Sequence, residues 1–330
     1  MKSFFPPIRI LLPFLLCPLA VLPAAGEESS GGKQQIEFRV EDIRVLWFGI
    51  VPTGVDVSIT KPIPSPLQER NSALFLKLGG GYEEKILYRS SDGTPIEHTA
   101  GIPEERLLRR QPNVQLMAGP VQGLLTGPRE NIAEAFLFYR GRFDYHYGPY
   151  DITPYLFQDG EFTDAGGLYG NSVLAGLSWN TVVRDAHRVP EGLYAESTVE
   201  WGPRWMGNDL YGRSDFYRFN IKARGYLPVW KFSTRRPNLL SAYLCAMGAF
   251  DYSGGEEVPI YVMQSFGGRG LRSGVGGSVR GFESRAYDTR LKGVINLEAR
   301  LNGPPLGDPS LMPIGFLFFD FGGYREYLNV

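Results

Sequence analysis

The sequence predicts an all-β fold, an antiparallel transmembrane β-barrel of which about 10–12 strands are visible in this chain. Three observations lead to this prediction. Apolar and polar residues alternate over many segments, as they do in strands with one apolar face. Several of these segments reach the ~9–11 residues that a tilted membrane strand needs. Short and long connections also alternate along the chain, which is typical of membrane barrels.

The composition of the chain suits many strands joined by tight turns. Of its 330 residues, 41 are glycine and 13% are aromatic, which favours a β-rich chain over a helical one. The formal net charge is -1, so no basic surplus favours nucleic acid as a partner. No apolar run after residue 25 approaches the ~20 residues that a membrane helix needs.

The N-terminus is predicted to be a secretory signal peptide, residues 1–26. Lys2 and Arg9 supply positive charge, residues 10–22 form an apolar core, and Ala24-Ala25-Gly26 offers small residues for cleavage. A membrane anchor is the alternative, but the apolar segment is short for one. We therefore expect this segment to direct export.

Residues 27–42 are polar and too short for an ordinary folded domain, so we expect a short periplasmic linker or a plug-like tail. Residues 43–330 are predicted to form the barrel. Cleavage after residue 26 leaves Cys245 as the only cysteine, which excludes an internal disulfide in the mature chain.

The predicted strands follow one another through the barrel region. In the clearest of them, Ile295 and Leu297 alternate with Asn296 and Glu298. The first strand, residues 43–51, is apolar at both parities, so its type stays open. The eleven predicted strands are residues 43–51, 54–63, 72–89, 113–125, 131–147, 172–184, 193–201, 217–227, 238–251, 291–301 and 317–322.

The connections between these strands alternate in length. Outer-membrane barrels show this alternation because their periplasmic turns are short and their extracellular loops are longer. The short connections are residues 65–71, 126–130, 185–191, 230–237 and 303–311. The long connections are residues 90–112, 148–171, 202–214 and 252–287.

Aromatic residues fall near the predicted strand ends, where a membrane protein has its aromatic girdles. Packing in a protein core is the alternative for them. These residues are Trp179, Trp201, Trp205, Tyr226 and Trp230.

No catalytic or metal-binding pattern stands out, so we expect neither an enzyme nor a cofactor. His98, His146 and His187 are scattered, and none has metal-ligand spacing with another histidine or cysteine. No glycine-rich loop continues into the Gly-Lys-Ser or Gly-Lys-Thr of a phosphate-binding loop. The serine-hydrolase signature G-x-S-x-G is absent.

Several short motifs occur in order along the second half of the chain. They are Arg224-x-Tyr226-x-Pro228, Gly267-Gly268, Val279-Arg280-Gly281-Phe282, Asn296-Leu297-Glu298-Ala299-Arg300 and Phe318-x-Asp320-x-Gly322. Together they resemble the C-terminal barrel of the bacterial surface antigen family, the BamA/TamA-like outer-membrane superfamily. The resemblance covers roughly residues 172–326. It implies a loop that carries Arg280 into the barrel lumen and a wall strand that carries Asp320.

The resemblance therefore implies a contact between Arg280 and Asp320. A guanidinium in a confined lumen needs a partner, and a carboxylate accepts it bidentately. The parity agrees, because Asp320 alternates with the apolar Phe319 and Phe321 and so faces inward. The alternative is a solvated loop arginine and a strand-end carboxylate. The motif residues expected to support the contact are Val279, Gly281, Phe282, Glu298, Arg300, Phe318 and Gly322.

The resemblance further implies a protein of the bacterial outer membrane that acts in membrane protein or lipid insertion or in translocation. Its expected partners are outer-membrane lipid and unfolded membrane-protein or lipid clients. One alternative is a structural or pore-forming surface antigen without assembly activity, and another is a soluble exported β-sandwich that binds ligands. The family places POTRA domains before the barrel and continues beyond F-x-D-x-G, so we expect a POTRA-less, truncated barrel.

Overall fold

The computed structural model describes most of the region that the sequence assigns to the barrel. All described residues belong to one compact unit, Lys33–Val330. The predicted signal peptide lies outside them, as do the three histidines and the motif residues Gly281 and Phe282. The described residues are 35–40, 43–46, 49–52, 54–64, 71–86, 108–127, 131–145, 166–184, 189–231, 241–280, 290–304 and 313–325.

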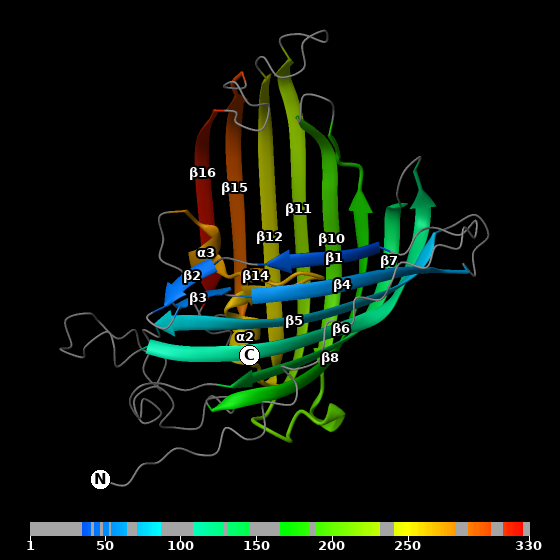
Figure 1. The fold of residues 1–330 in the computed structure, drawn as a ribbon, viewed down its shortest axis with the longest axis vertical. Coiled ribbons are helices and arrows are strands. Elements are labelled where there is room, and N and C mark those ends of the chain that lie inside the picture. Colours follow the sequence, from blue (N-terminus) through cyan, green and yellow to red (C-terminus); the bar gives the residue numbers. More distant parts are fainter. Residues whose placement is uncertain are drawn as a thin grey trace, which may run out of the picture. The chain divides into compact units, whose positions relative to one another are not determined.

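A 12-stranded antiparallel sheet organises these residues, and its strands pair in sequence order (Figure 1). Along the sheet they are β1 (Gln35–Val40), β4 (Gly54–Ile63), β5 (Ser72–Ile86), β6 (Leu108–Thr126), β7 (Asn131–Tyr145), β8 (Gly167–Asn180), β10 (Pro190–Gly202), β11 (Asp215–Lys231), β12 (Ser241–Glu257), β15 (Leu291–Asn302) and β16 (Ile314–Arg325), with β9 (Val183–Arg184) also paired to β10. Most contain 12 to 19 residues, longer than the ~5–6 of an ordinary strand. The predicted all-β, antiparallel fold is confirmed.

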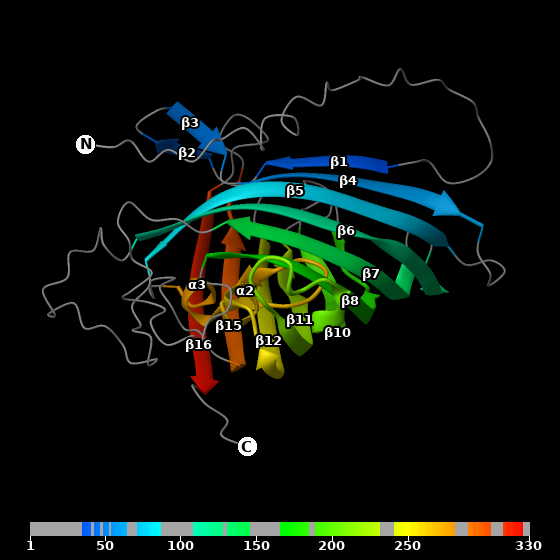
Figure 2. The ribbon, with the colours of Figure 1, turned by 90° about the horizontal axis from the view of Figure 1, so that it is seen from below.

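The sheet is strongly curved, and the segment between β12 and β15 lies on its concave side (Figure 2). This segment contains the short elements α2 (Ile260–Met263), β13 (Ser265–Phe266), β14 (Arg272–Ser273) and α3 (Val275–Ser278). A long loop inside the curve of the sheet is the arrangement that the sequence predicts. Within the described residues, the edge strands β1 and β16 do not pair with each other. No described helix has the length and apolarity needed to cross a membrane.

Two predictions for the first part of the chain are wrong. Residues 35–40, assigned to the linker, form β1 and pair with β4. Ile36, Phe38 and Val40 alternate with polar residues there, and the run is short enough to be taken for a polar tail. Residues 43–51 are not a strand of the large sheet. They belong to a separate hairpin of β2 (Ile43–Leu46) and β3 (Gly49–Pro52).

Some strand ends also differ from the prediction. β6 begins at Leu108 instead of Asn113, so the connection before it is shorter than expected. β12 ends at Glu257 instead of Asp251, so the connection after it is also shorter than expected. The extension of β12 contains Ser253, which is fully buried, so the strand continues through polar residues. The alternation of apolar residues stops before this extension, so the sequence pattern does not predict it.

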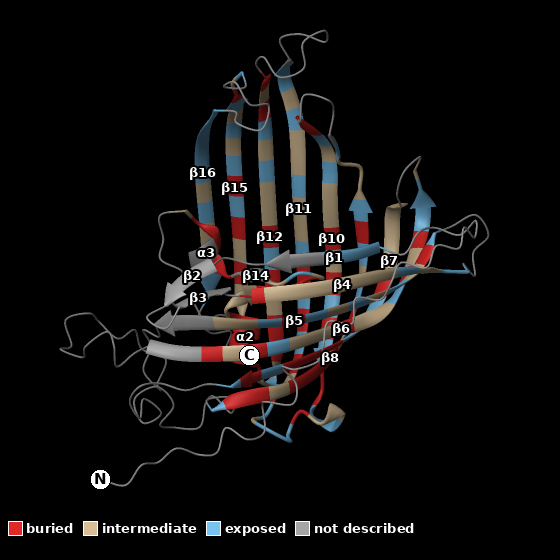
Figure 3. Cartoon of the chain, viewed as in Figure 1, coloured by how far each residue is buried: buried red, intermediate tan, exposed pale blue. Residues whose placement is uncertain are grey.

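Burial is inverted relative to a soluble protein, because many apolar residues are exposed and many charged residues are buried. Exposed and more buried residues alternate along the strands (Figure 3). In β10, Val199 is 53% exposed, whereas its neighbours Thr198 and Glu200 are 3% and 1% exposed. The exposed apolar residues define the outer face and include Leu74, Leu76, Leu78, Leu137, Leu177, Leu193, Val199, Phe219, Ile221, Leu227, Leu244, Phe250, Ile295, Leu297, Leu301, Leu317, Phe319 and Phe321. The inner face carries the buried polar residues Arg140, Arg142, Asp144, Ser172, Ser178, Glu196, Thr198, Glu200, Arg218, Asn220, Asp251, Ser253, Lys292 and Asn296.

The aromatic residues singled out in the sequence divide between the two faces. The four tryptophans of this set, Trp179, Trp201, Trp205 and Trp230, are 43% to 73% exposed. Tyr226 instead shares the parity of Lys222 and Arg224 and lies 6.4 Å, ring to ring, from Tyr243. Its assignment to an outer girdle is therefore wrong, because its side chain packs beside Tyr243, which is buried on the inner face.

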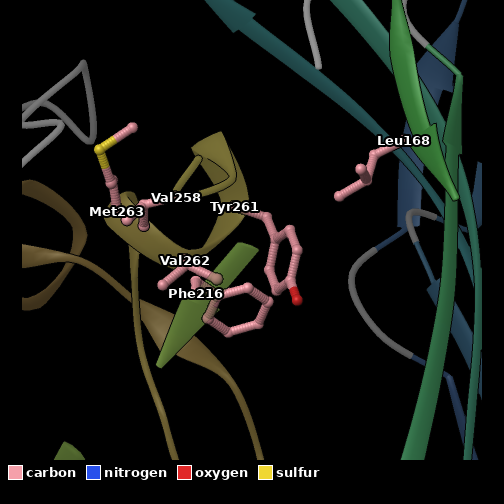
Figure 4. Close-up of a cluster of buried hydrophobic side chains, with 6 residues drawn as sticks. All are labelled: Leu168, Phe216, Val258, Tyr261, Val262 and Met263. Atoms are coloured by element: carbon pink, nitrogen blue, oxygen red, sulfur yellow. The ribbon is translucent and has the colours of Figure 1, made fainter. Parts of the chain in front are cut away.

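Apolar clusters inside the curve hold the intervening segment in place. One cluster joins α2 to the wall, and Figure 4 shows the Tyr261 ring beside Phe216 with Leu168 on the facing strand. The Phe216 and Tyr261 rings meet edge-on at 6.3 Å. A second cluster packs Phe266, Val275 and Val279 against Ala249 of β12 and Val294 of β15. Together they fix the segment at both of its ends.

Candidate functional site

The candidate site is the segment of residues 258–280, here called the inner segment, and the wall residues that contact it. Pro259 precedes α2, and a tight pair of short strands, β13 and β14, follows. Gly268 has φ +106, a conformation that favours glycine, and it places Arg269 at the tip of this turn. The local sequence therefore shapes a hairpin that presents an arginine to the wall.

Arg280 and Asp320 lie in direct contact. Arg280 Nε and Nη2 donate to the two Asp320 oxygens at 2.7 Å each, and the Arg280 backbone N–H donates to Oδ2 at 2.9 Å. Arg280 Nη1 also donates to Glu298 at 2.6 Å, and its guanidinium carbon lies 4.0 Å from the centre of the Phe318 ring. The hydrogen bond to Asp320 raises the pKa of Arg280 above its ordinary value. This is a bidentate, charge-assisted pair with a second carboxylate behind it.

The supporting motif residues divide by role. Val279 belongs to the apolar cluster with Val294, and Arg300 donates to the Glu298 that also holds Arg280. Gly322 allows the inner segment to approach the wall, because a Cβ there would lie 2.5 Å from Val275 Cγ1 and 2.7 Å from Val279 Cγ2. The wall around Asp320 is therefore shaped for close contact as well as for charge.

Arg269 forms a second anchor that the sequence reasoning missed. Its Nη2 donates to Glu134 Oε2 at 2.7 Å and to Ser178 Oγ at 2.6 Å, and its guanidinium carbon lies 4.1 Å from the centre of the Phe136 ring. Its backbone N–H donates to Glu196 at 2.9 Å. The available signal was an arginine among glycines, the same setting as Arg280.

Asp251 is the centre of a buried charge cluster at the wall. It accepts from Arg218 Nε at 2.9 Å, from Asn220 Nδ2 at 3.0 Å and from the Gly267 backbone N–H at 2.8 Å, and Lys292 Nζ lies 3.3 Å away. The side chains of Arg218, Asp251 and Lys292 are at most 1% exposed. Such a cluster is stable only when its charges are paired and its hydrogen bonds are made.

A second charge cluster lies beside the turn of the inner segment. Arg140 donates to Glu200 at 2.9 Å and to the Gly268 carbonyl at 2.6 Å. The guanidinium carbon of Arg142 lies 4.5 Å from the centre of the Tyr261 ring. Burial raises the pKa of the Tyr261 phenol above its ordinary value, so this phenol stays neutral among the charges.

Wall side chains thus bind the backbone of the inner segment along its length. Donors on the wall are Arg140, Arg218, Lys292 and Asn296, and acceptors are Glu196, Asp251 and Asp320. The backbone atoms that they bind are the carbonyls of Val262, Met263, Ser265, Gly268 and Ser278 and the N–H groups of Gly267, Arg269 and Arg280. Buried backbone groups need such partners in a segment without extensive secondary structure of its own.

The described part of the chain contains no group of three His, Cys, Asp or Glu side chains that could hold a metal ion. The charged side chains described above are committed to one another and to the inner segment. What this arrangement does physically is to hold a loop against the inside of the sheet.

Gly322→Ala is expected to lower the free energy of unfolding by about 1–3 kcal/mol, because the new methyl group displaces the two valines of the inner segment. The control is Gly323→Ala, next along the same strand, where a Cβ meets nothing within 4 Å. We expect that control to stay within about 0.5 kcal/mol of the parent. Urea unfolding measures both, and equal effects would contradict the close approach.

Comparisons with known proteins add little to this geometry. No protein-family model matches the chain, and no curated protein matches it. Among solved structures, it is similar to the crystal structure of BamA from Haemophilus ducreyi lacking POTRA domains 1-3, at 13% sequence identity and a TM-score of 0.49. That match covers 84% of this chain and 51% of the other, so the chain spans about half the length of that structure.

Proposed function

We propose that this chain is an outer-membrane β-barrel protein that assists the insertion or translocation of membrane-protein or lipid clients. One observation carries the membrane part of the proposal, namely the inversion of burial across the sheet. A soluble protein rarely exposes a contiguous apolar surface of this extent. In a bilayer the same surface contacts lipid, and the charged inner face is shielded from it.

The extent of the outer face fits a bilayer. Along β11 the outward apolar residues run from Tyr217 to Leu227. Ten residue steps of about 3.3 Å, tilted by about 40°, span roughly 25 Å, the height of the apolar band of a membrane barrel. Trp201 and Trp205 lie at one end of β10 with their rings 5.8 Å apart, both exposed, as interfacial aromatic residues are.

The edge of the sheet supports the assembly role. In the described residues β16 pairs only with β15, and Phe316, Leu317 and Phe319 of β16 are all more than half exposed. Lipid does not tolerate an unpaired strand edge. The assembly role assigns this edge to pairing with an incoming strand, which would satisfy its backbone groups in lipid. The mechanism proposed is therefore physical, a lowered barrier to insertion, and it needs no catalytic group.

A structural or pore-forming surface protein is the second candidate. The observation that favours it is the charged inner face, which suits a water-filled lumen. Current across a planar bilayer, together with no gain in the folding of an unfolded outer-membrane barrel added to proteoliposomes, would support this candidate. Faster client folding without a lasting current would support the assembly role.

Leu297→Arg tests the membrane placement. Leu297 is 43% exposed at the middle of β15, where a cation facing lipid costs about 2–4 kcal/mol. The control is Leu210→Arg, at a residue that is 75% exposed on the connection between β10 and β11. We expect only the first variant to lower the urea midpoint of the compact, heat-modifiable form in lipid vesicles. Two harmless variants, together with a protein that stays soluble without detergent, would contradict the membrane placement.

A further inference from the structure

A cavity of about 340 Å³ lies on the inner face beside the inner segment. Its lining combines the cations Lys222 and Arg224 with the rings of Tyr226 and Phe266 and the thioether of Met247. The volume falls in the range of about 300–1,000 Å³ that small-molecule sites occupy. The cavity is therefore large enough to hold a small ligand, and its lining offers both charged and apolar contacts.

Arg224 differs from the cations around it. Among the described cations of this part of the inner face, each of the others has a carboxylate partner. The pairs are Lys222 with Glu196, Arg269 with Glu134, Arg280 with Asp320 and Arg300 with Glu298. Arg224 contacts only neutral atoms in the described structure, the Tyr226 hydroxyl at 3.5 Å and Met247 Sδ at 3.4 Å. Its guanidinium is therefore available to an external anion.

Much of the cavity lining beside Arg224 is apolar, and none of the described residues that line the cavity is acidic. Phe266 of the inner segment is 1% exposed and packs with Ala249, which also lines the cavity. Met247 adds a flexible, polarisable side chain that adapts to the shape of an apolar ligand. A bare inorganic anion would leave this apolar lining unused. A neutral hydrocarbon would leave the guanidinium without a partner.

We propose that this cavity binds an anionic amphiphile, with its phosphate or carboxylate on Arg224 and its alkyl chain against Phe266, Tyr226 and Met247. The guanidinium binds either head group bidentately. The proposal also gives a role to the Arg224-x-Tyr226-x-Pro228 motif, which the anchoring of the inner segment does not use. This binding site is independent of the assembly role, because residues of the folded chain alone line the cavity and no client takes part.

The test is calorimetric titration of the folded protein in a nonionic detergent with hexyl phosphate, after subtraction of the same titration into empty micelles. Inorganic phosphate supplies the head group alone, and hexanol supplies the chain alone. We expect hexyl phosphate to bind at least about tenfold more tightly than either, because only it uses both parts of the cavity. Equal binding of inorganic phosphate and hexyl phosphate would overturn the amphiphile assignment.

The variant Arg224→Ala is expected to weaken the binding of hexyl phosphate about tenfold or more, since it removes the charged donor. Arg224→Lys should recover part of this loss, because it keeps the charge but not the planar fork. The matched control is Arg204→Ala, which removes an exposed arginine outside the cavity. An equal loss in that control, or no loss in Arg224→Ala, would refute the site.

Two sources of such a ligand are separated by extracting the purified protein with organic solvent. An anionic acyl lipid enriched in the parent protein over Arg224→Ala would identify the membrane as the source. Binding in the titration without any retained lipid would identify a soluble amphiphile. A gel shift on heating shows that each variant is folded, so a loss of binding is not a loss of structure.

Discussion

Asp251→Ala is expected to lower the free energy of unfolding by about 5 kcal/mol, the upper end of the range for breaking a buried ion pair. The substitution leaves two cations, Arg218 and Lys292, buried at 1% exposure or less without their shared carboxylate. It also removes the acceptor of the Gly267 backbone N–H, so the inner segment loses an attachment to the wall. Urea titration of the compact, heat-modifiable form measures the loss of stability.

A control and a compensating change sharpen this prediction. Asp209→Ala removes an exposed carboxylate from the connection between β10 and β11 and should change stability by less than about 0.5 kcal/mol. In the double variant with Lys292→Met, one of the two stranded cations is gone. We expect the double loss to be smaller than the sum of the single losses by about 0.5–3 kcal/mol. Additive losses would show that the charges do not interact.

Arg280→Ala is expected to lower the free energy of unfolding by about 3–5 kcal/mol, because it strands a carboxylate. The Asp320 side chain is only 2% exposed and loses both guanidinium hydrogen bonds, although its bonds from the backbone N–H of residue 280 and from the Asn296 side chain remain. Asp320→Ala should have a similar effect, and the double variant should be little worse than either single one. Limited proteolysis of the inner segment should quicken in all three, since the attachment at its C-terminal end loses its ion pair.

The matched control for this pair is Arg300→Ala. Arg300 contacts the same Glu298 as Arg280 does, but its side chain is 40% exposed and it belongs to the wall. Its ion pair should contribute no more than about 1 kcal/mol, as exposed pairs generally do. A loss as large as that of Arg280→Ala would place the effect in the general charge balance of the lumen and not in the contact between the inner segment and β16.

The middle of most strands was predictable because their outward side chains are apolar. Ile295 and Leu297, for example, alternate with Asn296 and Glu298, and this alternation gives the outward and inward faces of β15. The ends of the strands were less predictable, since a strand such as β12 continues through polar residues whose partners are on other strands. β1 was missed because six alternating residues next to a polar tail carry too little signal to separate them from a linker.

The Arg280–Asp320 contact was predictable because both residues lie in motifs that resemble those of one family. The partners of Arg269 were not, because its carboxylate Glu134 lies 135 positions away in the sequence and belongs to β7. The cluster around Asp251 is a similar case. Arg218 and Asn220 lie on β11, Lys292 lies on β15 and Asp251 itself lies on β12, so only the register of these three strands in the folded sheet brings the four residues together.

The hydrogen bonds between the wall and the inner segment mostly end on backbone atoms, and this decides which substitutions the segment tolerates. A carbonyl such as that of Val262, Met263 or Ser265 is present whatever the side chain is. The wall therefore specifies the path of the segment while leaving much of its own sequence free to drift. Relatives of this chain should conserve the inward-facing charges of the strands more strictly than the residues of the segment that those charges hold, apart from its two anchoring arginines and the glycines of its turn.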